Sequence, residues 1–529
     1  MSTHNKNIII QTPVGDDKSA KYSFDNILDI VGSFGRWQIC ALLLSTLSGF
    51  ICAFNHLGGL FLAYTPDTFY CEERHVTGQS GCESSNDTHC NKWIFSQNVM
   101  SSSLVTTFNL VCQDKLYLHL IQSTYMAGIV VATLVGGFCS DHFGRRTTLL
   151  GSSLLHCIAS FITAFSNDYN LFIMIRFLVG GSAHVMWSSI FVLIMESVNI
   201  EMRSLAGLHM NMAWNFGSLL MVGICYALRD WRNIQIAFAS IALLSTLHLW
   251  VCESPRWLLK NRKIKEADKS LRRIAAFNGV DLESTEYLRI FEDLARHAMS
   301  SIKEEDEDKS NTNSGVSLFK KVLPLMEDGE TRRRFLVLMI PFFCIGTSSY
   351  GIHFAAKLIP FNIFLVCVYK DLLIAFAALV GFFIFKKVQR IPYLLCCYGL
   401  TGVIGVTFIF LQYDVFRIIV YGILQSLVIA CFYFIDIYTP EVFPTNVRSQ
   451  AFSILDCWSK VGSAICTFIL DIGTDIHEDF PLVIFGILLL FASVTFLFLP
   501  ETKGIPLADN YEDLKKSKSF FHRKRSERV

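Results

Sequence analysis

Twelve apolar runs of about 20 residues, separated by polar segments, constrain the fold of this 529-residue chain more than any other feature. Each run is close to the length at which an α-helix crosses a hydrocarbon layer about 30 Å thick. Hydrophobic residues make up 52% of the chain and charged residues only 17%, so most of the apolar surface is expected to face lipid. We therefore predict an all-α membrane protein with twelve transmembrane helices. The predicted spans are Trp37–Ala63, Leu118–Ser140, Thr147–Phe165, Tyr169–Met195, Leu205–Ala227, Asn233–Cys252, Phe335–Ala355, Pro360–Phe385, Pro392–Leu411, Phe416–Ile437, Ala451–Leu470 and Pro481–Leu499.

Lys and Arg residues in the connecting segments predict the orientation of the spans. They fall in alternate connections, and short basic loops stay on the cytoplasmic side of a membrane. Both termini are then cytoplasmic, and the plasma membrane is the expected location. The first 35 residues are polar and mixed in charge, so we expect no cleavable signal sequence. The expected parts are a cytoplasmic N-terminus (1–36), a first six-helix half (37–259), a cytoplasmic loop (260–334), a second six-helix half (335–499) and a cytoplasmic tail (500–529).

The connection between the first two spans, residues 64–117, is the one long loop predicted on the outer face. It contains four cysteines, and in an oxidising compartment these predict two disulfides, with three possible pairings. Free thiols in this loop are the alternative. The sequon NDT at Asn86 predicts a glycosylation site in the same loop. The four cysteines are Cys71, Cys82, Cys90 and Cys112.

Acidic and basic residues recur at a nearly constant offset, and this recurrence predicts two related halves, which are common in carriers with twelve spans. The matched pairs are Glu196 with Glu441 and Arg203 with Arg448, both offset by 245 (441 minus 196, 448 minus 203), Arg146 with Arg390, offset by 244 (390 minus 146), and Glu253 with Glu501, offset by 248 (501 minus 253).

Motifs at the ends of these spans resemble the signatures of the major facilitator superfamily. They are "GGFCSDHFGRR", "RFLVGG", "ESPRWLL", "YTPEVFPTNVRS" and "PETKG". The outer loop, which ends in "SSLVTTFNLVCQDK" (Ser102–Lys115), narrows the resemblance to the organic ion transporter family of cation, anion and carnitine carriers. The resemblance extends from Tyr22 to Asp509. It implies the major facilitator fold and transport of small organic ions by alternating access.

Charged residues at the cytoplasmic ends of the spans are predicted to form gating latches. Asp141, Arg145 and Arg146 lie in a tight turn, in which Gly144 supplies the backbone freedom that the turn requires. Gln389 takes the place of Gly144 in the second half, so we expect a weaker latch there. Anchoring by basic residues alone is the alternative, but such anchoring needs no carboxylates. The expected partners in these latches are Glu196, Arg203, Glu441 and Arg448.

Missing motifs limit the chemistry that we expect of this chain. No G-x-x-x-x-G-K-[ST] phosphate loop occurs, so transport is expected to be facilitated, exchanging or coupled to an ion gradient rather than driven by ATP. No G-x-S-x-G or H-E-x-x-H motif occurs and the 14 histidines are scattered, so we expect no enzyme activity, no metal and no cofactor. The expected partners are an organic ion, a coupled or exchanged ion and the lipid bilayer, and no nucleic acid.

Ionisable and aromatic side chains inside the spans predict the substrate site, because ionisable residues are costly within a membrane and usually functional. At about 1.5 Å of rise per residue, Lys460 lies about 14 Å and Lys370 about 15 Å from the ends of their predicted spans, near the midplane. His184 and Trp187 on the fourth span and Trp214 on the fifth complete the predicted set.

The resemblance makes position 460 the most informative one. Lys460 stands where cation carriers usually have Asp and anion carriers usually have Arg. Trp214 matches an aromatic contact of the anion carriers, whereas Trp187, eleven residues after Arg176, resembles the cation carriers. Ile374 stands where relatives often keep an acid. This mixed pattern leans slightly toward organic anions or zwitterions. An organic cation transporter, a sugar porter and a non-transporting receptor of the same fold are the alternatives.

Asp456 precedes Lys460 by four residues, a spacing that brings two side chains together on one helix face. An internal ion pair is one interpretation. In the other, Lys460 pairs with the negative group of a substrate stacked against Trp214 and Trp187, and Lys370 supplies a second positive charge. An ammonium near the midplane costs at least about 2.5 kcal/mol unless it is compensated, and this cost favours the substrate interpretation.

Overall fold

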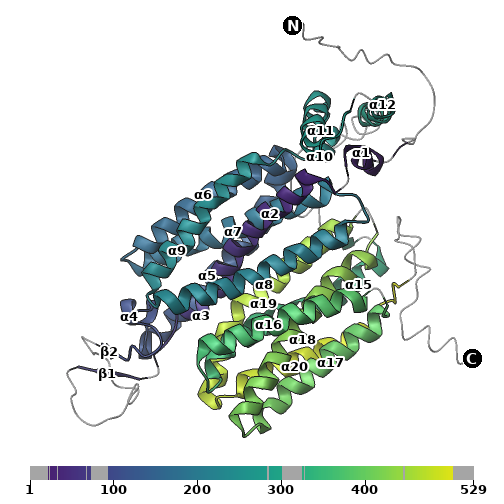
Figure 1. The fold of residues 1–529 in the computed structure, drawn as a ribbon. Helices are drawn as coiled ribbons and strands as arrows, with labels where there is room; N and C mark the ends of the chain where they lie inside the picture. Colours follow the sequence, from purple (N-terminus) through teal and green to yellow (C-terminus); the bar gives the residue numbers. More distant parts are fainter. Residues whose placement is uncertain are drawn as a thin grey trace, which may run out of the picture.

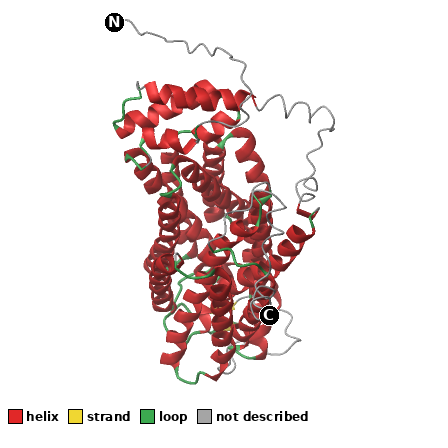
Figure 2. Ribbon diagram, turned by 90° about the vertical axis from the view of Figure 1, so that its right-hand side faces the viewer, coloured by secondary structure: helices red, strands yellow, loops and turns green. Residues whose placement is uncertain are grey.

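Helices make up most of the described chain (Figure 2). The computed structural model describes residues 22–503 apart from 23, 33, 67, 73–92, 283–284, 301–324, 327, 386 and 445–446. Among these residues, twelve helical segments are long and apolar enough to cross a membrane. The predicted number of spans is therefore confirmed, and it includes the eighth and eleventh spans, which carry charged residues.

The first six spanning segments form one half of the bundle. Two of them are continued by a short helical segment at one end. They are α2 (Arg36–Leu57) with α3 (Gly59–Leu62), α5 (Lys115–Phe143), α6 (Arg145–Phe165), α7 (Tyr169–Ser197), α8 (Arg203–Leu228), and α9 (Trp231–Leu243) with the 3-10 helix η2 (Leu244–Trp250).

The last six spanning segments form the second half. The tenth span continues past its predicted end at Ile437, so that Asp436 lies inside the helix rather than at its edge. The six are α15 (Gly329–Phe354) with η3 (Ala355–Leu358), α16 (Ile363–Phe385), α17 (Arg390–Thr407) with η4 (Phe408–Phe410), α18 (Asp414–Val442), α19 (Arg448–Ile476), and α20 (Phe480–Thr495) with η5 (Phe496–Phe498).

Short elements gather at the two ends of the bundle (Figure 1). We call the end at which α6 and α17 begin, with Arg145 and Arg390, the basic end, and the opposite end the loop end. The basic end carries α1 (Phe24–Val31), α10 (Pro255–Lys260), α11 (Ile264–Asn278) and α12 (Thr285–Ser300). The loop end carries the antiparallel strands β1 (Phe69–Cys71) and β2 (Trp93–Phe95), with Phe69 opposite Phe95, as well as α4 (Leu104–Phe108) and the 3-10 helix η1 (Cys112–Asp114).

The two halves lie side by side and meet along two pairs of helices, α5 with α19 and α8 with α16 (Figure 1). Within the second half, α19 packs tightly on α15 because Gly346 carries no side chain. A Cβ atom on Gly346 would lie 2.0 Å from the carbonyl oxygen of Ser459. The Ser463 hydroxyl also donates a hydrogen bond to the Gly346 carbonyl at 3.0 Å. This packing fixes the position of α19, the helix that carries Lys460.

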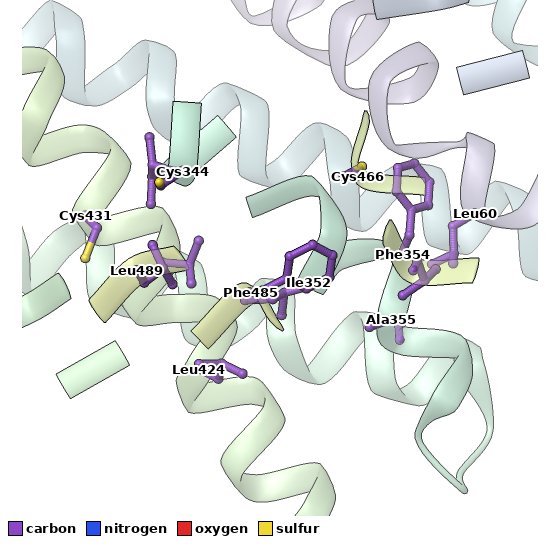
Figure 3. Close-up of a cluster of buried hydrophobic side chains, with 14 of the residues drawn as sticks. Leu60, Cys344, Ile352, Phe354, Ala355, Leu424, Cys431, Cys466, Phe485 and Leu489 are labelled. Carbon is purple, nitrogen blue, oxygen red and sulfur yellow. The ribbon is translucent and has the colours of Figure 1, made fainter. Parts of the chain in front are cut away.

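Apolar side chains fill the interior of the second half, as the packing of lipid-facing helices requires (Figure 3). The same buried cluster reaches the first half near the loop end, where Leu60 of α3 and Phe354 of α15 belong to it. Other members in Figure 3 are Cys344 and Ile352 of α15, Leu424 and Cys431 of α18, Cys466 of α19, and Phe485 and Leu489 of α20.

The predicted disulfides and glycan fall mostly outside the described residues. Cys82, Cys90 and Asn86 lie within residues 73–92, which the structure does not describe. Cys71 and Cys112 are described and are not among the free thiols. The disulfide pairing and the glycan therefore remain predictions.

Candidate functional site

A carboxylate at the basic end caps the start of α6. Glu253 accepts hydrogen bonds from the backbone N–H groups of Arg145, at 3.0 Å, and Arg146, at 3.0 and 3.1 Å. The Arg145 guanidinium pairs with Glu196 of α7 at 3.1 Å and with Asp141 of α5 at 3.0 Å. We call this set of contacts the first clamp. It ties the ends of α5, α6 and α7 to the segment that follows η2.

Gly144 makes the first clamp possible. Its backbone has φ 104° and ψ 158°, a region that is nearly restricted to glycine. A Cβ atom at this position would also lie only 2.3 Å from Oε2 of Glu253. A side chain here would therefore displace the carboxylate that caps α6.

The second half repeats these contacts at the start of α17. Glu501 accepts the backbone N–H of Arg390 at 2.9 Å and that of Ile391 at 3.0 Å. The Arg390 guanidinium pairs with Glu441 of α18 at 3.2 Å, and the hydroxyl of Thr502 donates to Glu441 at 2.6 Å. We call this set the second clamp. It forms although Gln389 stands where the first half has glycine.

The two clamps correct the residue pairing that was expected from the sequence. Arg390 matches Arg145, not Arg146, because both donate their backbone N–H to the capping carboxylate and both pair with a glutamate on the next helix. The offset is then 245 (390 minus 145), the same as for Glu196 and Glu441. Arg146 instead donates to the carbonyls of Val251, at 2.7 Å, and Leu249, at 3.0 Å.

The other two predicted gating arginines also make contacts at the basic end. Arg203 pairs with Asp25 of α1 at 3.2 Å, and Arg256 pairs with the same carboxylate at 2.9 Å. Burial lowers the pKa of the Arg256 guanidinium, and Asp25 opposes this shift. Arg448 donates to the carbonyl of Phe443 at 3.2 Å. These contacts tie α1 to the first half and hold the start of α19 in the second.

Ion pairs join the two halves at the loop end. Lys115, at the start of α5, pairs with Asp471 of α19 and lies 3.5 Å from Asp475. His119, one turn along α5, lies 3.1 Å from Asp471. We call these contacts the loop-end bridge.

Two further contacts close the loop end between the halves. The His353 ring of α15 hydrogen bonds with the carbonyl of Leu57 of α2 at 3.3 Å. The rings of Phe61 on α3 and Phe364 on α16 stack with their centroids 5.1 Å apart. Polar and aromatic contacts thus hold the two halves together at this end.

Lys460 lies between the two halves, about 18 Å along α19 from its start. Its ammonium is 3.2 Å from Asp456, so the internal pair that the sequence allows does form. The ammonium also lies 5.2 Å from the centre of the Phe432 ring of α18. Tyr350 of α15 and Asp436 of α18 act on it electrostatically.

Aromatic side chains of the first half line the other side of this site. The rings of Trp187 and Trp214 meet edge to face with centroids 6.0 Å apart, and Trp214 meets His56 of α2 at 5.0 Å. His184, less than one turn before Trp187, acts electrostatically on Asp456 and Lys460. The structure therefore brings together four of the five predicted substrate residues.

Lys370 is the fifth, and it lies elsewhere. It is about 10 Å from the start of α16 at the loop end rather than at the midplane, because the helix begins after Pro360. Its ammonium is buried and pairs with Asp371 at 2.5 Å. Asp371 in turn accepts a hydrogen bond from Ser218 of α8 at 2.7 Å. Lys370 thus contributes to the contact between the halves.

Three polar residues of this region were missed in the sequence. Asp436 lies one residue before the predicted end of its span, Ile437. The Tyr125 hydroxyl and Nδ1 of His56 form a hydrogen bond at 2.7 Å. Arg176 donates to the carbonyl of Asn55 at 2.9 Å, and its guanidinium lies 4.6 Å from the centre of the Tyr125 ring. The only indication of these residues in the sequence was a polar residue within an apolar run.

Among the described residues, no group of three His, Cys, Asp or Glu side chains could hold a metal ion.

Comparisons with known proteins agree with this architecture. The xylose transporter XylE from E. coli, in its inward open conformation, superimposes with a TM-score of 0.61 at 17% identity, covering 91% of this chain and 99% of that one. Three relatives align over 93% of this chain. They are solute carrier family 22 member 3 of Rattus norvegicus (26% identical, 96% of its length), organic anion transporter 3 of Homo sapiens (27%, 93%) and the organic cation transporter protein of Drosophila melanogaster (25%, 94%).

A family model described as "Sugar (and other) transporter" matches residues 37–513, which include both halves and both clamps. The chain therefore belongs to the sugar (and other) transporter family, in the major facilitator superfamily of membrane transporters, which are not enzymes.

Proposed function

We propose that this chain carries small organic ions across a membrane by alternating access, and that its substrate is an organic anion or zwitterion whose negative group binds Lys460. The position of Lys460 carries this proposal. Its ammonium lies 5.2 Å from the centre of the Phe432 ring and acts electrostatically on His56 and His184 of the first half, and its ion-pair partner belongs to its own helix. Relatives that are named as organic anion and organic cation transporters support the organic-ion class.

The pair with Asp456 is compatible with substrate binding. An ammonium in the interior of a bundle needs a compensating charge. A carboxylate or sulfonate that enters the site can replace Asp456 without leaving Lys460 unpaired at any stage. Asp456 lies four residues closer to the basic end, about 6 Å, and its side chain is 18% exposed, so it can turn to water when the substrate takes its place.

The aromatic side chains suit the apolar part of an organic ion. Trp187 and Trp214 come from the first half and Phe432 from the second, and all three are half-buried. Aromatic rings prefer offset or edge-to-face contacts with flat apolar groups. A substrate held by both halves is what alternating access around a central site requires.

An organic cation is the second candidate, and Asp436 is the observation that favours it. If Asp436 and Asp456 were both ionised, two carboxylates would face one ammonium. Trp and Phe rings also attract cations. The charge of Asp436 therefore decides which ion the site prefers.

We further propose that the basic end faces the cytoplasm and the loop end faces the outside of the plasma membrane, with both termini cytoplasmic. The excess of Lys and Arg at the basic end supports this orientation. In this orientation the outer loop is oxidised, which supports two disulfides among Cys71, Cys82, Cys90 and Cys112 and a glycan at Asn86.

The clamps supply the proposed gating. Each clamp makes one half rigid at the basic end. The loop-end bridge then holds the two halves together at the loop end, so that the site is closed to the outside. Opening to the outside would break the loop-end bridge and move the basic ends together. The gating residues are Asp141, Arg145, Arg146, Glu196, Arg203, Glu441 and Arg448, with Lys370 at the contact between α16 and α8.

Uptake by the purified protein in proteoliposomes tests this function. The probes are benzenesulfonate as an anion, carnitine as a zwitterion and tetraethylammonium as a cation. Lys460→Ala should weaken benzenesulfonate binding roughly 10- to 100-fold, because a hydrogen bond to a charged group contributes about 1.5–3 kcal/mol. Lys460→Arg should keep most of the uptake, and Lys265→Ala, an exposed control on α11, should change nothing. If the protein takes up tetraethylammonium but does not take up benzenesulfonate, the result would favour an organic cation as the substrate.

A further inference from the structure

Asp436 is an ionisable residue inside a membrane-spanning helix. It lies six residues before Val442, the end of α18, and thus about 9 Å from the basic end. Its Oδ1 atom is buried and has no hydrogen-bond partner among the described residues. Carboxylates at such depth are rare and mark ion or proton pathways. A buried oxygen without a donor therefore calls for a functional explanation.

The charges around Asp436 do not balance if its carboxylate is ionised. Lys460 attracts it and Asp456 repels it. Lys460 is already paired with Asp456 at 3.2 Å, and Asp436 takes part in none of the ion pairs found in the described part of the chain. An ionised Asp436 would be a surplus negative charge inside the bundle. Buried groups in this position usually become neutral by binding a proton.

The other titratable groups near this site do not supply the missing positive charge. Helix α18 packs against α15, α16, α17 and α19. A tyrosine side chain carries no positive charge, His184 acts on Asp456 and Lys460 from the first half, and the single lysine of α16 is already paired. These groups are Tyr433 of α18, Tyr398 of α17, Tyr350 of α15, His184 of α7, and Lys370 with Asp371 of α16.

We propose that Asp436 is a proton-binding site of the transport cycle: its carboxylate holds a proton in this structure and releases it when the site opens to water on the other side, so that a proton moves together with the substrate. This rests on the proposed function, because it assumes that a negative group of the substrate binds Lys460. The step is a protonation alone, in which the carboxylate and one H⁺ form a carboxylic acid and no other bond changes.

Proton binding and anion binding strengthen each other in this arrangement. When Asp436 is protonated, the charges of Lys460 and Asp456 cancel, and an entering anion is repelled by one ionised carboxylate. When Asp436 is ionised, the same anion is repelled by two ionised carboxylates. Because like charges disfavour one another at short range, the proton raises the affinity for the anion, and the anion raises the affinity for the proton by the same factor. A carrier coupled in this way moves one proton with each monoanion.

An infrared measurement tests the proton without any substrate. A protonated carboxyl group has a C=O stretching band distinct from that of a carboxylate. The purified protein at neutral pH should show such a band, and Asp436→Asn should remove it. Asp414→Asn, an exposed control at the other end of α18, should leave the band in place. A band that persists in Asp436→Asn, or is missing from the unchanged protein, would overturn the proposal.

Transport in proteoliposomes tests the coupling. Benzenesulfonate is the probe because a sulfonate does not bind protons at these pH values, so any effect of pH belongs to the protein. An inward gradient of one pH unit should drive up to about tenfold accumulation if one proton accompanies each anion. Asp436→Asn mimics the protonated acid, so its exchange of labelled for unlabelled probe should not depend on pH and the gradient should drive no accumulation.

Two outcomes separate this proposal from the proposed function. Accumulation that remains driven by the gradient in Asp436→Asn, or uptake by the unchanged protein that ignores the gradient, rejects the proton site while leaving anion transport intact. If the unchanged protein shows no benzenesulfonate uptake, the proposed function is rejected. The infrared band then still decides whether Asp436 binds a proton.

Discussion

A single glycine decides whether the first clamp can form. Gly144→Ala should destabilise the protein by at least about 1–3 kcal/mol, because its φ and ψ angles are strained for alanine and the new Cβ would displace Glu253. The thermal unfolding midpoint in detergent should fall. Gly137→Ala on α5 is the matched control, since nothing lies within 4 Å of its Cβ position. Equal midpoints for both variants would contradict this role of Gly144.

The residues of the site were predictable from sequence to different degrees. Lys460, Trp187, Trp214 and His184 could be found because charged and bulky polar side chains are conspicuous in apolar spans. Lys370 was conspicuous for the same reason, but its partner Asp371 is adjacent in sequence, a spacing that normally points two helix side chains apart. Only the structure shows that this lysine is neutralised.

Among whole helices, the first clamp connects the ends of α5, α6 and α7, and the second connects the ends of α17 and α18. Arg145→Ala and Arg390→Ala should each slow transport while leaving the amount of protein at the membrane mostly unchanged, because each removes the link between neighbouring helices but no apolar packing. Initial uptake rates and surface labelling measure the two effects. Arg289→Ala, at an exposed position of α12, is the control. Normal rates in both clamp variants would remove the gating role.

The loop-end bridge makes a separate prediction. Asp471→Asn should loosen the contact between α5 and α19, since it removes the charge that both Lys115 and His119 face. Hydrogen–deuterium exchange should rise in the first turns of α5 and the last turns of α19. Asp475→Asn should have a smaller effect, because that side chain is 70% exposed and lies 3.5 Å from Lys115. Equal exchange in both variants would argue against the bridge.

The spans themselves could be predicted because length and apolarity are set locally. Their ends were less certain. Helix α18 continues to Val442 beyond its apolar run, because Glu441 is held by Arg390 and Thr502 of neighbouring segments. Such tertiary contacts are not visible in a hydropathy pattern. The error concealed the depth of Asp436, the residue on which the charge of the site depends.

At the scale of the molecule, duplication explains why one set of contacts occurs twice. The clamps use the same residue types at matching positions, and each belongs to one half. The sequence offset predicted this repetition. It did not predict which end of the bundle holds the halves together, because that depends on contacts between residues far apart in the chain.

The orientation of the whole molecule can be tested at the outer loop. Asn86→Gln should remove a glycan-sized shift in gel mobility if the loop end faces the outside. Treatment of the unchanged protein with a glycosidase should produce the same shift. If Asn86→Gln migrates like the unchanged protein, and the glycosidase still changes the mobility of the unchanged protein, the proposed glycan at Asn86 would be contradicted.

Lys460 is proposed to bind the negative group of the substrate and not only to neutralise Asp456. Benzenesulfonate uptake by Lys460→Ala, Asp456→Ala and the double variant distinguishes these two roles. If Lys460 binds the substrate, Lys460→Ala loses uptake and the added Asp456→Ala does not restore it. If the pair is only structural, Asp456→Ala misfolds, the double variant folds, and that double variant transports the anion at the normal rate.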